Sequence, residues 1–181
     1  MTSARPRFAA VPPLLIGALL GFIAGYFAAG GARPSAAAPA KAAAPASTGI
    51  SDLEKAVEKD PQNPKALQAL GNGYYDLGDW EHAADAYERA RRKNTGDANL
   101  LSDLGVAYRN LGEFKKAATL FRKAREANPD HWQSLLNLVL LETFDRRDGA
   151  AAQKELEELR RRFPEIPNMD RLQEQVAKIR G

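Results

Sequence analysis

The sequence predicts an all-α solenoid, in which antiparallel helix hairpins stack between capping helices and follow a single N-terminal membrane helix. Two features of the 181-residue chain predict this architecture. The first is an internal repeat of 34 residues, and the second is a long apolar run near the N-terminus. A repeat of this length indicates that each unit is one supersecondary element that must stack on its neighbours to bury its apolar face.

Ten positions of the internal repeat agree between its two copies. When the two copies are aligned, small residues match small residues and aromatic residues match aromatic ones. Because this agreement exceeds what an alanine-rich composition produces by chance, the repeat decides the fold class. The first copy contains Leu70, Gly71, Tyr74, Leu77, Gly78, Trp80, Ala83, Ala84, Tyr87 and Ala90, and the second contains Leu104, Gly105, Tyr108, Leu111, Gly112, Phe114, Ala117, Ala118, Phe121 and Ala124.

Each repeat unit reads as two helices joined by a turn. Apolar residues recur at helical spacing before Gly78 and Asp79 and again after them. We expect Gly71 and Gly105 to lie where the two helices approach closely, against Ala83 and Ala117, with the aromatic side chains filling the wider part of the interface.

The residues of these units resemble the tetratricopeptide repeat. The second copy carries the motif of that family with Leu101, Leu104, Gly105, Tyr108, Ala117, Phe121, Ala124 and Pro129. The first copy departs from it once, with Thr95 in place of the closing proline. The resemblance implies repeat units at 64–97 and 98–131, and a concave face, lined by the first helix of each unit, that holds a peptide or helix of a partner.

A third unit, at 132–166, matches the pattern less well. In strict register Glu155 and Glu158 take the core positions of its second helix. One extra residue in the turn at 144–149 instead places Ala152, Leu156, Leu159 and Pro164 at the family positions. We expect the insertion, because without it the two glutamates would be buried unpaired.

Capping segments flank the three units. Residues 50–63 are expected to form a half-repeat whose helix begins at a capping box, Ser51 with Glu54. Residues 167–181 are expected to form a polar helix with one apolar stripe, which is typical of a terminal cap.

The apolar run at 11–30 is long enough to span a bilayer as a helix. Arg5 and Arg7 favour a cytoplasmic N-terminus at 1–10. The alternative is a cleaved signal peptide, because small residues come after the run. Residues 31–49, which are rich in Ala and Pro, are expected to form a flexible linker that can turn helical in its alanine runs. The glycines Gly17, Gly21 and Gly25 recur every four residues and could pack two such helices into a homodimer.

Composition and charge exclude several classes of function. The chain has no cysteine, which excludes disulfides and thiolate chemistry. Of the 26 basic residues, four precede Gly49, whereas all 23 acidic residues come after it. The repeat region therefore carries 22 basic and 23 acidic residues, and nothing favours nucleic-acid binding.

No motif in the sequence indicates an enzyme. His82 and His131 are the only histidines, and neither has a second metal ligand at a suitable spacing. We expect both to be solvated. No phosphate-binding loop or nucleophile motif is present, so we expect no catalytic residue, metal or cofactor.

The expected partner site comes from the family resemblance. Its amides suit an extended peptide backbone, because they both donate and accept hydrogen bonds; the alternative is that they are merely soluble surface positions. Of the carboxylate-clamp residues found in some members only Asn72 is matched, so a chaperone-tail clamp is not expected. The site comprises Lys65, Gln68, Asn72, Tyr75, Asp76, Asn99, Ser102, Asp103, Val106, Arg109, Asn110, Gln133 and Asn137, together with Leu136 and Leu140.

The predicted function is a membrane-anchored scaffold that binds a protein partner. The layout is similar to that of bacterial envelope proteins that assist translocation, maturation or assembly, which implies the inner membrane with the repeats in the periplasm. One alternative is an accessory subunit that docks on a larger membrane complex through Leu136, Leu140 and Leu141. An enzyme is a remote third possibility.

Overall fold

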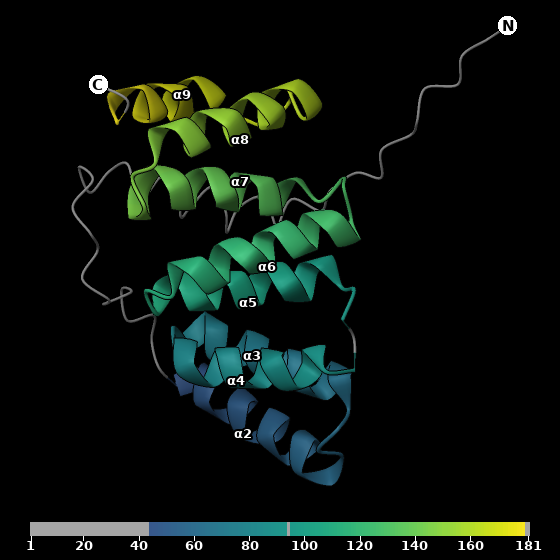
Figure 1. Ribbon diagram of the computed structural model, residues 1–181. Coiled ribbons are helices and arrows are strands. Elements are labelled where there is room, and N and C mark those ends of the chain that lie inside the picture. The colour runs from purple at the N-terminus through teal and green to yellow at the C-terminus, as the bar shows by residue number, and fades with distance from the viewer. Residues whose placement is uncertain (1–43, 94, 180–181) are drawn as a thin grey trace, which may run out of the picture. The chain divides into compact units, whose positions relative to one another are not determined.

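The computed structural model describes residues 44–93 and 95–179, and every regular element in these ranges is a helix (Figure 1). Successive helices pack against each other along the chain. The elements are α2 (Ala44–Lys59), α3 (Pro64–Leu77), α4 (Trp80–Arg91), α5 (Ala98–Asn110), α6 (Phe114–Ala127), α7 (Trp132–Leu140), the π-helix η1 (Leu141–Asp145), α8 (Gly149–Arg162) and α9 (Met169–Lys178).

The predicted units correspond to helix pairs: α3 with α4, α5 with α6, and α7 with α8. Sharp turns close the first two pairs, and Gly78 and Gly112 adopt φ angles of 75° and 78° there. Only glycine occupies this left-handed region without strain. Aspartate or asparagine side chains cap the N-termini of α3, α4, α5 and α8, which satisfies amide groups that have no partner inside the helix.

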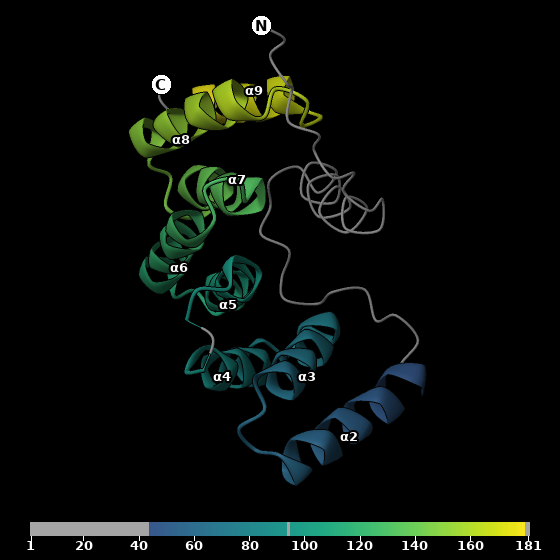
Figure 2. The same cartoon turned by 90° about the vertical axis from the view of Figure 1, so that its right-hand side faces the viewer.

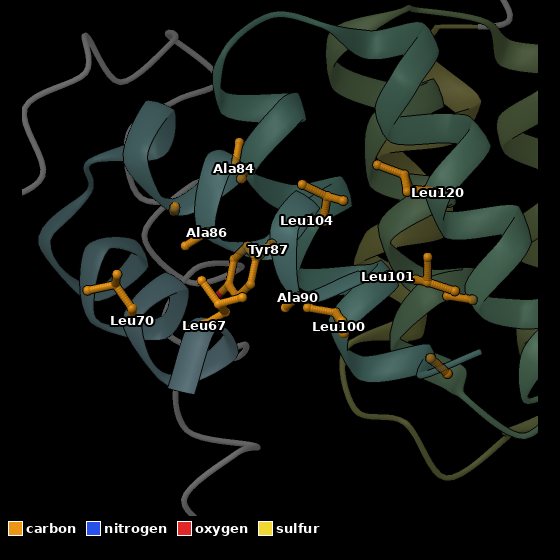
Figure 3. Close-up of a cluster of buried hydrophobic side chains, with 14 of the residues drawn as sticks. Leu67, Leu70, Ala84, Ala86, Tyr87, Ala90, Leu100, Leu101, Leu104 and Leu120 are labelled. Carbon is orange, nitrogen blue, oxygen red and sulfur yellow. The ribbon is translucent and has the colours of Figure 1, made fainter. Parts of the chain in front are cut away.

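The first two units share one apolar core, shown in Figure 3. Tyr87 and Phe121 are almost completely buried. A Cβ atom added to Gly71 would lie 2.5 Å from Cδ1 of Tyr87, and one added to Gly105 would lie 2.5 Å from Cε1 of Phe121. The prediction of a close approach at both glycines is therefore confirmed. The nearest atoms to both glycines belong to the aromatic rings and not to the predicted partners, Ala83 and Ala117.

The third unit contains the predicted extra residue, but within the helix that precedes the turn and not in the turn itself. The structure absorbs it in η1, where one π-helical turn continues α7, and not in the loop before α8. Ala152, Leu156 and Leu159 are fully buried, as the insertion predicts. Glu155 is buried nonetheless; it avoids the expected penalty because Arg125 on α6 donates to its Oε2 atom at 2.8 Å.

The N-terminal cap is longer than predicted. Helix α2 begins at Ala44 and not at Ser51, so the predicted capping box lies inside the helix, and the predicted linker is helical over 44–49. Alanine favours helix strongly, and Pro45 is compatible with a first turn. The side chains of Ile50 and Leu53 lie against Gly73 of α3, which lets α2 cover the first unit.

The predicted membrane helix at 11–30, with Gly17, Gly21 and Gly25, lies outside the described residues, as do 1–10 and 31–43. Within 44–93 and 95–179, no helix has both the length and the apolar character needed to cross a bilayer.

Candidate functional site

The first helices of the units form one side of the repeat stack. Figure 2 shows α3 and α5 on one side and α4 and α6 on the other. We call the exposed and half-buried predicted site residues on this side the first-helix face. They are Lys65, Gln68, Asn72, Tyr75 and Asp76 on α3, Asn99, Asp103, Val106 and Asn110 on α5, and Gln133 on α7.

Three polar residues of the predicted site are instead buried between helices. Asn137 on α7 donates a hydrogen bond from Nδ2 to Oγ of Ser102 on α5, at 3.2 Å. Arg109 on α5 donates from Nε to Asp145 in η1. These bonds join the second unit to the third, so the three side chains position the helices that carry the site.

The apolar residues predicted for the third unit are also buried. Leu136 and Leu140 are 2% and 3% exposed, and Leu141 is completely buried in a cluster with Ala117 and Phe121. Among the described residues, the large apolar side chain that is exposed is Leu77, at 48%. The described part of the chain therefore gives no support to docking through the third unit.

Asn72 is held in place by a buried tyrosine of the same unit. Tyr87 donates a hydrogen bond from its hydroxyl to Oδ1 of Asn72, at 2.8 Å. Asn72 is exposed, and its Nδ2 group makes no hydrogen bond with the described residues. The amide is therefore oriented with its acceptor toward the helix pair and its donors free.

Asn99 on α5 is held in the same way by His131, the N-cap of α7. His131 lies with Nε2 at 3.1 Å from Oδ1 of Asn99, and its Nδ1 atom accepts from the backbone N–H of Ser134, at 3.3 Å. These contacts require the tautomer protonated at Nε2. The Nδ2 group of Asn99 is then left without a hydrogen bond among the described residues, so Asn72 and Asn99 both present amide donors.

The expectation that both histidines are solvated was wrong for His131. This residue is buried, and burial lowers its pKa, although Asp97 opposes the shift. It caps α7 and contacts Asn99 on α5, a position that no local pattern revealed. His82 is exposed, as expected, with Nδ1 at 2.7 Å from Oδ2 of Asp79.

Two residues of the first-helix face have raised pKa values. Burial raises the pKa of Asp103 to about 7, and the neighbouring charge of Asp97 adds to the shift. Burial, followed by the charges of Asp103 and Asp76, raises the pKa of Tyr75 to about 12. The ring of Tyr75 also meets Trp80 edge-on, with 5.2 Å between centroids.

Two residues that shape this site, Asp97 and Asp145, were not predicted from the sequence. Asp97 accepts from the N–H of Leu100 at 3.1 Å as the N-cap of α5, a role that its place before an apolar helix could have revealed. Asp145 lies in the π-helical turn. Its contact with Arg109 had no signal in the sequence, because the turn itself was not predicted.

The arrangement of the described residues is suited to binding. Within the described ranges, no three His, Asp or Glu side chains converge as metal ligands. The donors and acceptors lie along the first helices of successive units and not around a single reacting point. Such a surface is suited to a ligand that extends across repeats.

Comparisons with solved structures support the fold assignment. A tetratricopeptide repeat protein from Parabacteroides merdae superposes with a TM-score of 0.66 and 19% identity, over 75% of this chain and 53% of that one. MamA superposes with a TM-score of 0.63 and 20% identity, over 72% of this chain and 81% of MamA. The first repeat domain of Spaghetti (RPAP3), bound to the HSP90 peptide SRMEEVD, superposes with a TM-score of 0.60 and 20% identity. The match covers 67% of this chain and 97% of that one. At these identities the likeness shows the fold alone.

Sequence comparison identifies the family. No curated protein sequence matches the chain. The tetratricopeptide repeat family profile matches three overlapping segments, 49–98, 68–131 and 102–164, which together cover all three helix pairs. Repeats of this kind are generally modules for protein interaction. The internal repeat, the stacked helix pairs and the profile match agree, and the chain belongs to the tetratricopeptide repeat family.

Proposed function

We propose that this chain is a membrane-anchored scaffold that binds an extended segment of a partner protein on its first-helix face. The observation that carries the proposal is that the Oδ1 atoms of Asn72 and Asn99 are both held by buried side chains. Tyr87 fixes the first amide and His131 the second, and each retains an Nδ2 group without a partner among the described residues. Fixed donors on the first helices of successive units can bond the carbonyl groups of an extended backbone with little further loss of side-chain entropy.

The anchor is supported by the sequence. The apolar run at 11–30 has the length of a membrane helix, and Arg5 and Arg7 favour retention of the N-terminus in the cytoplasm. The repeats would then lie on the other side of the bacterial inner membrane and serve envelope assembly, translocation or maturation. The strip formed by Gly17, Gly21 and Gly25 would permit a homodimer through this helix.

Site-specific photo-crosslinking in intact cells tests the binding proposal. A benzophenone amino acid replaces Asn110, which is exposed on the first-helix face, or Lys123, which is exposed on α6. We expect protein crosslinks from position 110 and few from position 123. Equal crosslinking from both positions would contradict the proposal.

A matched variant tests the role of the amides. Replacement of Asn72 and Asn99 by aspartate keeps the oxygen that accepts from Tyr87 or His131 and removes the free N–H donors. We expect crosslinking from position 110 to fall several-fold while the melting temperature of the domain changes little. Unchanged crosslinking would show that these donors do not hold the partner.

A further inference from the structure

The second helices of the first two units turn one row of residues outward. On α4 this outer row begins at Glu81 and ends at Arg92, the C-cap, and on α6 it begins at Lys115 and ends at Glu126. The two ends of each row are about three turns apart, or ~16 Å, so they lie on the same side of the helix. Figure 1 shows that α4 and α6 run in the same direction, and Figure 2 shows both on the side away from α3 and α5.

The four residues at the ends of the outer rows are not used inside the chain. Glu81, Arg92, Lys115 and Glu126 are all exposed. Their side chains make no hydrogen bond or ion pair with the described residues. These charges therefore do not contribute to the packing of the helix pairs.

The charges of the two outer rows are opposite at equivalent positions of the 34-residue repeat. The opposite pairs are Glu81 with Lys115, Glu88 with Arg122, and Arg92 with Glu126. Arg89 and Lys123 carry like charges, but Asp85 pairs with Arg89 at 3.6 Å in the same chain. The outer row of α4 is thus complementary to the outer row of α6, from one end to the other.

A two-fold axis parallel to these helices would bring the complementary rows of two copies together. Rotation about such an axis keeps the direction of each helix, so α4 of one copy lies parallel to α6 of the other. Glu81 then faces Lys115 of the second copy, and Arg92 faces Glu126. The symmetry repeats both contacts with the two copies exchanged, so all four free charges gain a partner.

The other two-fold arrangement is less favourable. An axis perpendicular to the helices would set α4 antiparallel to α4 of the second copy. Glu81 would then meet Arg92, but Asp85 would meet Glu88, and two carboxylates at close range repel each other. The parallel arrangement instead places Asp85 opposite Thr119, which carries no charge.

We propose that two copies of this chain associate through the outer rows, with α4 of each copy parallel to α6 of the other. Exposed ion pairs contribute little one by one, so separate copies should associate weakly. Two copies held in one membrane by the anchor proposed above would meet at a higher effective concentration. The first-helix face stays free in this dimer, because it lies on the other side of the stack.

Disulfide crosslinking tests the arrangement, because the chain has no cysteine of its own. Asp85→Cys with Thr119→Cys places one thiol in the middle of each outer row, at exposed positions. Intact cells that express this full-length double variant are treated with copper phenanthroline. We expect a disulfide-linked dimer from the double variant and little from either single variant. Dimer from Asp85→Cys alone would indicate α4 against α4, and absence of dimer from the double variant would exclude the contact; either result overturns the proposal.

Charge reversal in the double-cysteine chain tests the ion pairs. Glu81→Lys should lower the dimer yield about tenfold, because two attractive contacts become repulsive. Addition of Lys115→Glu should restore the yield, because the reversed charges attract again. Glu174→Lys, a change of an exposed residue on α9, is the control and should leave the yield unchanged. Equal yields from Glu81→Lys and the control, or no recovery on addition of Lys115→Glu, would refute the charge complementarity.

This proposal and the proposed function fail separately. Crosslinks between two copies have twice the mass of the chain, so such products from a benzophenone at position 123 are distinct from crosslinks to a partner. Absence of partner crosslinks from position 110 would overturn the proposed function and leave the dimer in place. Absence of the disulfide-linked dimer would overturn the association of two copies and leave the first-helix face as the partner site.

Discussion

Gly105 stands so close to Phe121 that a single methyl group would not fit between them: its Cβ atom would lie 2.5 Å from Cε1 of the ring. Gly71 and Tyr87 repeat this relationship in the preceding unit. The two helices of each unit thus pack through a glycine on one and an aromatic ring on the other. This contact explains why both residue types recur after 34 positions.

The variant Gly105→Ala should destabilise the domain although alanine favours helix. The gain in helix propensity is about 1 kcal/mol, whereas overpacking a buried aromatic ring costs typically ~1–3 kcal/mol. We expect a net loss in the free energy of unfolding, measured by urea denaturation. Gly96→Ala is the control, because a Cβ atom there meets nothing within 4 Å. An equal stability for both variants would contradict the packing argument.

Asp103→Asn should stabilise the domain, and more at high pH than at low pH. The pKa of Asp103 rises from 3.8 to about 7 on folding. Between these values the native state holds a proton that the unfolded state has lost, so the free energy of unfolding falls as the pH rises. The difference between variant and wild type should grow from pH 5 to pH 8, up to about 4 kcal/mol. Thermal unfolding at both pH values measures it, and a constant difference would refute the burial of this carboxylate.

His131→Gln should alter the response of stability to acid. Burial lowers the pKa of His131 below 6.5, so below that pH the unfolded state takes up a proton that the native state excludes. Wild-type stability should therefore fall as the pH drops from 6.5. The variant should lose about 1 kcal/mol at pH 8 and show a weaker acid response. His82→Gln, a change of an exposed histidine, serves as the control, and an identical pH profile for the two variants would exclude His131 as the cause.

Arg125→Met should destabilise the third unit. Arg125 donates to Oε2 of Glu155 at 2.8 Å and to Oε2 of Glu158 at 3.2 Å, which links α6 to α8. Its loss leaves the buried Glu155 without its partner and should cost about 1–3 kcal/mol in urea denaturation. Addition of Glu155→Leu should restore much of that loss. If the double variant is less stable than Arg125→Met, the penalty does not come from the unpaired carboxylate.

The proposed anchor makes a prediction for the full-length chain. It should remain in the membrane pellet after alkaline carbonate extraction, whereas a chain lacking 11–30 should be released. Gly21→Ile should weaken self-association in a membrane two-hybrid assay, because a large side chain separates closely packed helices. A mature protein whose N-terminus begins after Ala38 would instead identify a cleaved signal peptide.

The third unit shows where prediction from sequence reached its limit. Its extra residue was evident, because Ala152, Leu156 and Leu159 regain the repeat pattern only with an insertion. Its location was not, because a loop and a π-helical turn can each absorb one added residue and leave the next helix in the same register. Likewise, the charge of Glu155 predicted that this side chain would be exposed. It is buried because Arg125 on a neighbouring helix pairs with it.

The sequence by itself determined the helix pairs and their order of stacking. Both depend on short-range periodicity: apolar spacing within each helix, glycine at the turns, and a 34-residue interval between equivalent contacts. Only the tertiary structure decided how the polar residues of the first helices are used. Asn137 donates a buried hydrogen bond to Ser102, whereas the Nδ2 groups of Asn72 and Asn99 have no partner among the described residues. The outcome depends on which side chain of another helix lies opposite each amide.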